Sequence, residues 1–351
     1  MKLYRIILVA LLSVISLAMS AKDGSADRAD STGFDIKSVI FGHIEDAYSW
    51  HITKIGDHDI AVPLPVIVRS STGWHVFMSS RFDGGASYKG LYISESSDLA
   101  GKIVERCPDG SEVRPTDISI TKNVFSMLLS STLLIVLVLS TARWYRRHDV
   151  TKEAPKGIAA FMEPAVMMVD DGIVKESIGE DYEKFSPYLC TAFFWILINN
   201  MLGIVPFFPG GANVTGNLAV TGVLGICSFL AINLFGTKKY FKDIFWPDVP
   251  WWLKFPIPLM PVIEFFSALT KPLSLMIRLF ANMFAGHVIG VSIVCVIFIF
   301  AKYNAVIFGS MTVVTVLLGV FMDLLEVLVA FLQAYIFTIL SAVFIGLARQ
   351  K

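Results

Sequence analysis

Long stretches without a charged side chain decide what this sequence can fold into. From Phe185 to Thr237 there is no Asp, Glu, Lys or Arg. A helix crosses the hydrocarbon core of a bilayer with about 20 apolar residues, so this run is long enough for two crossings. Hydrophobic residues make up 55% of the chain and charged residues only 17%, against roughly 25% charged residues in an ordinary soluble domain. We therefore predict an all-α polytopic membrane protein.

The charge balance and the motifs exclude several other classes of protein. Lys plus Arg and Asp plus Glu both number 29, so the net charge is zero and no nucleic acid partner is expected. No GxxxxGK[ST] phosphate-binding motif is present in the sequence. The four cysteines are scattered along the chain, at Cys107, Cys190, Cys227 and Cys295. This spacing predicts neither a disulfide framework nor a clustered metal motif, and we expect no cofactor and no metal.

The first twenty residues resemble a secretory signal. Lys2 and Arg5 give a positive start, Ile6 to Ala18 an apolar core, and Ala18-Met19-Ser20 a small-residue cleavage site. We interpret residues 1–20 as a signal peptide, with an uncleaved anchor as the alternative.

Residues 21–121 are polar and mixed, and they predict a small, mainly β domain outside the membrane. Its strand-like runs are separated by turn residues: Trp50 to Thr53, Pro65 to Val68, Trp74 to Met78 and Gly90 to Ile93. The region also holds His43, His51, His58 and His75. Their spacing matches no compact metal-ligand motif, so surface or packing histidines are favoured over a metal site.

Residues 122–148 predict the first transmembrane helix with a basic end. Val124 to Ala142 is uncharged, and Arg143-Trp144-Tyr145-Arg146-Arg147 follows at once. The positive-inside rule places this cluster in the cytoplasm. The domain of residues 21–121 is then outside, which agrees with the signal-like start.

Residues 149–237 predict a cytoplasmic interfacial segment followed by a membrane hairpin. The segment 149–184 mixes acidic and apolar residues, as an interfacial helix does. The hairpin, 185–237, is broken at Pro206 to Gly211, with spans expected at about Pro187 to Val205 and Asn217 to Phe235.

The last third of the chain predicts two unusually long membrane helices. Residues 238–260 begin with a basic cluster and continue as an interfacial segment rich in Trp and Pro, in which no regular helix is expected from Trp246 to Pro261. Within 261–351, helices of about 60 Å each are expected from Pro261 to Phe300 and from Val306 to Arg349. A hydrocarbon core is about 30 Å thick, so such helices must tilt steeply, bend or project. The chain then has about five membrane-crossing segments and a cytoplasmic C-terminus.

Ionisable residues within the predicted spans are the candidates for function, because a charge in lipid costs about 2.5–3.5 kcal/mol on insertion scales. At 100° per residue, Glu264, Lys271 and Asn282 lie within about 40° of Arg278 on one helix. Small residues lie along or beside that face and allow another helix to approach: Ser267, Ser274, Ala281 and Ala285. The alternative is a structural arginine paired with a neighbouring carboxylate.

The last helix carries a similar polar stripe. Asp323, Glu326 and Gln333 follow at steps of 3 and 7 residues, which favours a water-accessible proton or cation path over a hydrogen-bonded packing seam. His287 lies nine residues after Arg278, on the opposite side of its helix, and must serve another partner. A histidine in a span suits a proton relay, with simple packing as the alternative.

Two motifs in these helices make the chain recognisable. KPLSLMIRLFANMFAGH, from Lys271 to His287, resembles the central motif of subunit a of F-type ATP synthase, and LQAYIF, from Leu332 to Phe337, resembles its C-terminal helix motif. The resemblance covers about residues 156–351. The long N-terminal domain departs from the commonest form of the family and resembles its extended bacterial versions.

The resemblance implies a role for each candidate residue. Arg278 corresponds to the arginine of the fixed stator that faces the carboxylate on the rotating c-ring, and Asn282 and Gln333 match its polar neighbours. Glu264, His287 and Glu326 match channel positions. Some bacterial members carry Glu at the position of His287 and His at that of Glu326. The reverse arrangement here keeps one acid and one imidazole.

The function that the resemblance implies is proton translocation, without catalysis in this chain. Two half-channels would serve the c-ring carboxylates, separated by the charge of Arg278. The implied partners are the c-ring, the stator subunit b, the rest of the ATP synthase and the lipid bilayer, and the implied location is the bacterial inner membrane. The alternatives are a stand-alone secondary ion transporter, which predicts internal repeats that the sequence does not show, and an intramembrane hydrolase, which needs companions that His287 lacks in the sequence.

Overall fold

The computed structural model describes residues 46–55, 58–94, 96, 99–106, 111–149, 152–205, 208–246, 259–300 and 304–350. The predicted signal peptide, His43 and most of the Trp/Pro segment lie outside the described residues, as do the side chains of His51 and His58. Where the structure is described, no three His, Cys, Asp or Glu side chains form a group that could hold a metal.

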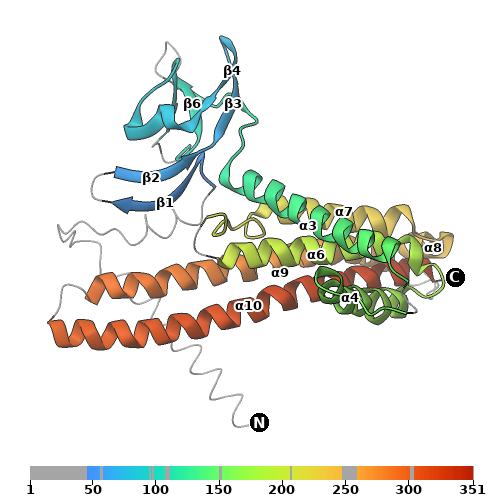
Figure 1. Cartoon of the computed structure of the whole chain (residues 1–351). Coiled ribbons are helices and arrows are strands. Elements are labelled where there is room, and N and C mark those ends of the chain that lie inside the picture. The colour runs from blue at the N-terminus through green and yellow to red at the C-terminus, as the bar shows by residue number, and fades with distance from the viewer. Residues whose placement is uncertain are drawn as a thin grey trace, which may run out of the picture. The chain divides into compact units, whose positions relative to one another are not determined.

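The predicted fold class is confirmed, since the chain is mainly helical with a small β region before the first long helix (Figure 1). Four of the described helices are long and apolar enough to cross a membrane: α3 (Lys122–Arg147), α6 (Ser186–Ile204), α9 (Leu259–Phe300) and α10 (Ala305–Arg349). A fifth crossing is formed if α7 (Leu218–Leu234) and α8 (Lys238–Phe245) count as one broken span, bent by 105°.

The N-terminal β domain consists of three small antiparallel sheets. Their strand orders are β1-β2, β4-β3-β8 and β5-β6-β7. The bounds are β1 Ser49–Ile55, β2 His58–Pro63, β3 Pro65–Ser70, β4 Gly73–Met78, β5 Leu91–Ile93, β6 Ile103–Arg106, β7 Glu112–Val113 and β8 Thr116–Asp117, with a 3₁₀ helix at Ser79–Gly85. Alternate residues of β3, Val66 and Val68, are fully buried, as expected for strands with one face on a core. They pack with Tyr48, Phe82, Leu91 and Ile103.

Helix α3 contacts α6 through one narrow stripe. Ser126, Ser130 and Leu134, spaced four residues apart, are buried, and Ser130 Oγ lies 2.9 Å from Asn199 Oδ1 of α6. Small side chains at this spacing allow two helices to approach closely. The other faces of α3 carry exposed Leu, Ile and Val.

The segment between α3 and α6 folds into short helices. They are α4 (Ile158–Val169), a π-helical turn at Asp170–Lys175, α5 (Glu176–Ile178) and a 3₁₀ turn at Tyr182–Lys184. Ala159, Met162 and Val169 of α4 are buried while Phe161 is 78% exposed. An amphipathic helix of this kind suits an interface between membrane and water.

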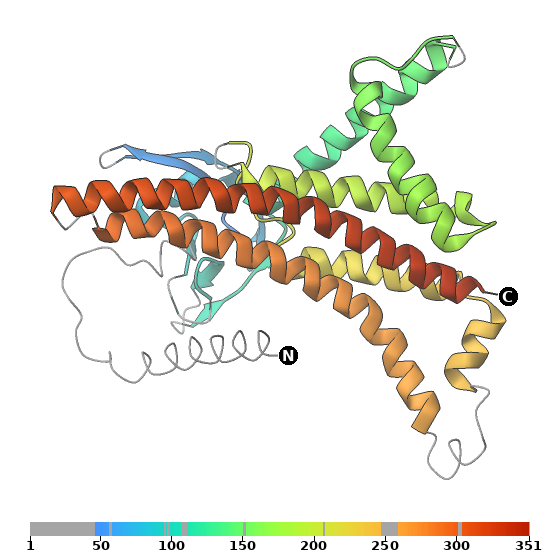
Figure 2. The ribbon, with the colours of Figure 1, turned by 90° about the horizontal axis from the view of Figure 1, so that it is seen from below.

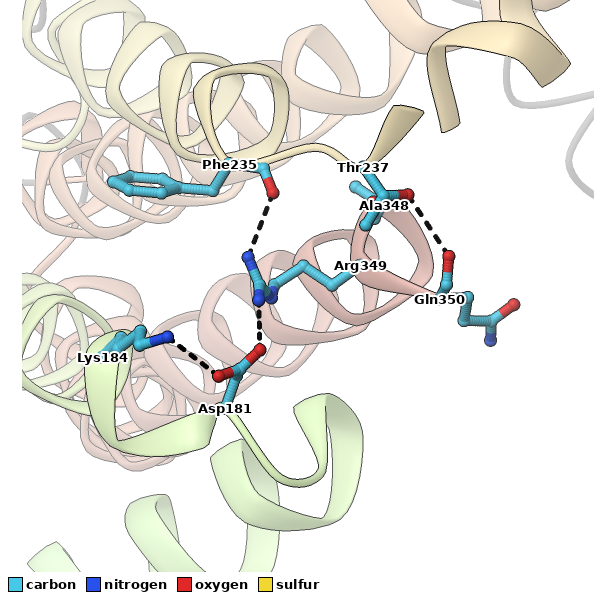
Figure 3. A network of polar contacts seen from close by, with 7 residues as sticks. All are labelled: Asp181, Lys184, Phe235, Thr237, Ala348, Arg349 and Gln350. Carbon is cyan, nitrogen blue, oxygen red and sulfur yellow. Dashed lines mark hydrogen bonds and ion pairs between the residues drawn. The ribbon is translucent and has the colours of Figure 1, made fainter. Parts of the chain in front are cut away.

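The C-terminal end of α10 is held by two other segments of the chain (Figure 3). The Arg349 guanidinium forms an ion pair with Asp181 and donates a hydrogen bond to the Phe235 carbonyl, with an N–O distance of 3.3 Å. Lys184 Nζ lies 2.9 Å from Asp181 Oδ1. Hydrogen bonds from Lys184 and Arg349 hold the pKa of the Asp181 carboxyl below its usual range.

A glycine near that end allows the closest approach between α10 and the segment before α6. A Cβ on Gly346 would lie 2.1 Å from the carbonyl oxygen of Ser177, which is a backbone atom and cannot swing aside. A Cβ on Gly309, near the other end of α10, would meet nothing within 4 Å.

We predict that Gly346→Ala lowers the thermal unfolding midpoint of the purified protein in detergent, because overpacking costs typically about 1–3 kcal/mol. Gly309→Ala is the matched control, and it should leave the midpoint unchanged or raise it, since Ala is favoured over Gly in helices by about 1 kcal/mol. Equal midpoints for the two variants would contradict the close contact.

Candidate functional site

All seven candidate residues lie on α9 and α10. These two helices run side by side in opposite directions (Figures 1 and 2). With 42 and 45 residues, they are about 63 and 67 Å long at 1.5 Å per residue. Each is about twice as long as the hydrocarbon core is thick.

Arg278 lies at a hollow between the two helices. The hollow has a volume of about 460 Å³, and its lining residues are Thr270, Lys271, Ser274, Leu275 and Arg278 of α9 with Leu340 and Phe344 of α10. The Lys271 ammonium lies 5.6 Å from the centroid of the Phe344 ring, a cation–π distance. Lys271 thus has a partner within the hollow.

Arg278 itself is exposed and, within the described residues, makes no ion pair or hydrogen bond. The alternative was a structural arginine paired with a neighbouring carboxylate. Within the described residues, Arg278 has no such carboxylate partner. A guanidinium on an apolar helix without a partner needs an anion or water from outside the chain.

The helix face around Arg278 is lined by small residues and is open. Ser274, Ala281, Asn282 and Ala285 share the exposed stripe of α9 with Arg278. Because their side chains are short, the backbone of another helix can approach this stripe closely. The arginine then projects further from α9 than its neighbours along the stripe.

His287 and Glu326 meet across the two helices. The Nδ1 atom of His287 lies 3.2 Å from Glu326 Oε1, and both side chains are largely buried, at 13% and 15% exposure. The contact has ion-pair distance without hydrogen-bond geometry, since Glu326 Oε1 accepts no hydrogen bond from the described residues. The sequence had placed His287 on the far side of α9 from Arg278, and its partners here lie on α6 and α10.

Both ring nitrogens of His287 face acceptor oxygens. Nε2 lies 3.2 Å from the Gly203 carbonyl oxygen of α6, and Nδ1 lies 3.1 Å from the Met283 carbonyl oxygen. A neutral imidazole has only one N–H to donate, whereas a doubly protonated ring has two. Each ring nitrogen therefore faces an oxygen to which it can donate when it carries a hydrogen.

Two glycines make room for this pair. A Cβ on Gly203 would lie 3.4 Å from His287 Cε1, and a Cβ on Gly286 would lie 3.0 Å from Glu326 Oε1. The second distance is too short for an ordinary contact. Glycine at these positions therefore lets α6 and α9 approach the ionisable side chains directly.

A buried amide on α6, three residues before Gly203, was not among the predicted site residues. Asn200 of α6 is 1% exposed. It donates from Nδ2 to the Ala330 carbonyl oxygen of α10 at 3.2 Å and accepts from Thr215 Oγ1 at 2.7 Å. The signal in the sequence is the pair Asn199-Asn200 inside an otherwise apolar span, where a polar side chain is expected to have a partner.

The remaining candidates are not gathered at one point. Asp323 is exposed, Gln333 is 5% exposed, and Glu264 is half-buried in the second turn of α9. The nine residues from Arg278 to His287 correspond to about 13 Å along α9. The site thus has two separate parts on this helix: an arginine at an open hollow, and a buried imidazole–carboxylate pair further along. Such an arrangement can hold a fixed charge at one place and exchange protons at another.

Comparison with known proteins divides the chain in the same place as the fold. The family described as "ATP synthase A chain" matches residues 125–346, and a family described as a domain of unknown function matches residues 39–124. The boundary between the two matches falls at the first turn of α3.

Curated relatives support the longer match. The chain is 40% identical over 244 residues to ATP synthase subunit a of Chloroherpeton thalassium, covering 68% of each chain. It is also 40% identical over 244 residues to ATP synthase subunit a 2 of Chlorobaculum tepidum, covering 68% of this chain and 65% of that one. With ATP synthase subunit a of Myxococcus xanthus it shares 38% identity over 300 residues, covering 83% and 88%.

Proposed function

The chain belongs to the ATP synthase A chain family, and we propose that it passes protons to and from the c-ring of an F-type ATP synthase through two half-channels separated by the charge of Arg278. Members of this family are proton-translocating membrane subunits, so the chain itself is non-catalytic although the whole complex is an enzyme. The observation that supports two half-channels separated by Arg278 is the position of this arginine, which is exposed at the open hollow and has no partner within the described residues.

The proposed partner of Arg278 is the c-ring carboxylate. A positive charge left alone in lipid costs about 2.5–3.5 kcal/mol or more, and an opposing carboxylate removes much of that cost. The open stripe of small residues beside Arg278 suits a helix of the ring passing closely. Because a nearby positive charge favours the ionised form of an acid, each ring carboxylate would give up its proton as it reaches the arginine.

The outer half-channel is assigned to the pair of His287 and Glu326. His287 lies between Arg278 and the end of α9, and Glu326 lies on the half of α10 nearer its start, so both are on the side of the site toward the connection between the two helices. The positive-inside rule places that connection outside. An imidazole and a carboxylate 3.2 Å apart can exchange a proton with water and with each other. Asp323, one turn of α10 further out, extends this polar path.

The inner half-channel is assigned to the hollow that Arg278 lines. It extends from Arg278 toward Thr270 and Phe344, in the direction of the basic C-terminal end of α10. Glu264 lies further toward the same end of the site on α9, and Asn282 and Gln333 flank the arginine region. A proton would enter by one half-channel, travel with the rotating ring, and leave by the other, driven by about 2.3 kcal/mol per charge per 100 mV.

The proposed setting is the bacterial inner membrane, with subunit b and the other subunits of the ATP synthase as partners. In this orientation the N-terminal β domain lies outside the cytoplasm. The Arg143 to Arg147 cluster and the C-terminus lie inside. The support is the basic end of α3 and the signal-like start of the chain.

Arg278→Ala should abolish proton-driven ATP synthesis in inverted membrane vesicles while the protein remains inserted, because the barrier charge is gone. Arg278→Lys should fail or nearly fail, since a compact ammonium does not replace the planar guanidinium. Lys271→Met is the matched control in the same hollow and should keep most of the synthesis rate. Near-normal synthesis by either Arg278 variant excludes the barrier role.

His287→Ala and Glu326→Ala should each reduce proton flux without the complete block expected for Arg278, because water can partly replace a relay group. The exchange His287→Glu with Glu326→His restores one acid and one base, so it should recover more flux than either of its single substitutions. Proton uptake by vesicles is compared at matched protein level. A double exchange no better than its worse single variant means that the two residues do not act as a pair.

Protease added to spheroplasts should cleave the N-terminal β domain, and N-terminal sequencing of the mature protein should begin near Ala21. Both follow from the orientation that the basic cluster predicts. The cytoplasmic segment between α3 and α6 serves as the internal control, since it should be cut only after the membrane is broken. Full protection of the β domain in spheroplasts would overturn the orientation.

A further inference from the structure

The loop between α6 and α7 contains four consecutive residues that are buried almost completely. Ala212, Asn213, Val214 and Thr215 are only 1–2% exposed. Connecting loops usually run over the surface, since their backbone groups need water. This loop therefore lies beneath another part of the molecule.

Trp50 of β1 is one of the side chains that cover these residues. Trp50 is 4% exposed and clusters with Ala212 and Val214. Its ring meets Phe125 of α3 edge to face at 5.8 Å and Phe208 of the loop at 5.4 Å. Phe208 also lies stacked with Phe125 at 6.3 Å, so the three rings form one aromatic cluster that joins the β domain, α3 and the loop.

The position of Trp50 is fixed from two sides. In the β1-β2 pair it stands opposite Val62, which packs against the same cluster. Just before β1, the Ala47 carbonyl accepts the backbone N–H of Lys122 at 2.9 Å, and Asp46 Oδ1 accepts that of Asn123 at 3.0 Å. The β domain is thus fastened to the first turn of α3, and Trp50 is held over the loop.

The covered loop in turn contacts the surroundings of His287. The Gly211 N–H donates to the Leu202 carbonyl oxygen at 3.0 Å, which folds the loop back on the end of α6. A Cβ on Gly203 would lie 3.4 Å both from the Ala212 carbonyl oxygen and from His287 Cε1, so Gly203 is close to both the loop and the imidazole. The Gly203 carbonyl is the acceptor that faces His287 Nε2.

We propose that the N-terminal β domain is a cap for the proton path and that Trp50 is its positioning residue. Trp50 holds the 208–217 loop against the end of α6. The loop in turn keeps the Gly203 carbonyl in the position in which this carbonyl orients His287. The proposal rests on the relay role of His287 proposed above. It gives a function to residues 39–124, which match a domain of unknown function.

The test measures ATP-driven proton uptake by inverted vesicles that contain the complete ATP synthase, at matched levels of the chain. Trp50→Ala should lower the flux by about three- to tenfold, which is within the range of coupling through packed residues. Trp50→Phe should restore most of it, since an aromatic ring still fills the site. Trp74→Ala is the matched control: Trp74 belongs to the same domain but is 56% exposed, so its removal should leave the flux unchanged.

A double-mutant cycle with His287→Ala separates positioning from a general structural effect. If Trp50 acts through His287, then Trp50→Ala should cause little further loss in the His287→Ala background. An equal fold-loss in both backgrounds overturns the proposal, and so does normal flux with Trp50→Ala alone. If Trp50→Ala does not accumulate in the membrane, Phe208→Ala removes the loop's side of the same contact and is judged by the same cycle.

The two proposals fail in different ways. If the ATP synthase function is wrong, Arg278→Ala keeps its proton flux whatever Trp50 does. If Arg278→Ala is blocked but the losses from Trp50→Ala and His287→Ala multiply independently, only the positioning role of Trp50 is excluded.

Discussion

The cost of an unpartnered charge in hydrocarbon is the constraint on which the arrangement of this molecule depends. It explains why charged residues are absent from Phe185 to Thr237 and why the few that occur in α9 and α10 have defined surroundings. Lys271 lies against the Phe344 ring, and His287 lies against Glu326 and two carbonyl groups. Arg278, like Asp323 and Glu264, has no ion pair or hydrogen bond within the described residues, but of these three only Arg278 lines the open hollow. In the proposed function, another subunit supplies the missing partner of Arg278.

Glycine provides the close approaches that bring these groups together. Gly203 and Gly286 admit the imidazole and the carboxylate, and Gly346 admits the Ser177 carbonyl. At Gly286 and Gly346 a methyl group would press on a polar atom, whereas at Gly203 it would make an ordinary contact with the Ala212 carbonyl oxygen and the His287 ring. The path is therefore lined partly by backbone, whose carbonyl groups cannot ionise and whose positions depend on helix packing.

Much of the fold followed from the sequence because the signals are strong in lipid. The charge-free runs, the basic cluster at the end of α3 and the prolines and glycines after α6 indicate where the spans lie. Helices α6 and α7 begin and end within two residues of the expected limits. The spacing of nine residues on α9 also placed His287 on the opposite side of the helix from Arg278. The bend between α7 and α8 was not predicted, although Lys238, Lys239 and Lys242 alternate with Phe241, Ile244 and Phe245 at helical spacing. Nor did sequence reasoning find Gly203, Asn200 or the contact of Trp50 with Phe208, since these depend on which distant segments meet.

The open stripe on α9 has a mechanical consequence. A surface along which another protein moves must adhere weakly and evenly, or the partner would stop at the strongest contact. Ser274, Ala281 and Ala285 offer short, smooth contacts, and Arg278 is the one charged group among them. In the proposed function, the c-ring would move along this face through weak, even contacts and meet one charged group, so that each advance by one ring subunit would bring the same electrostatic contact to the same place.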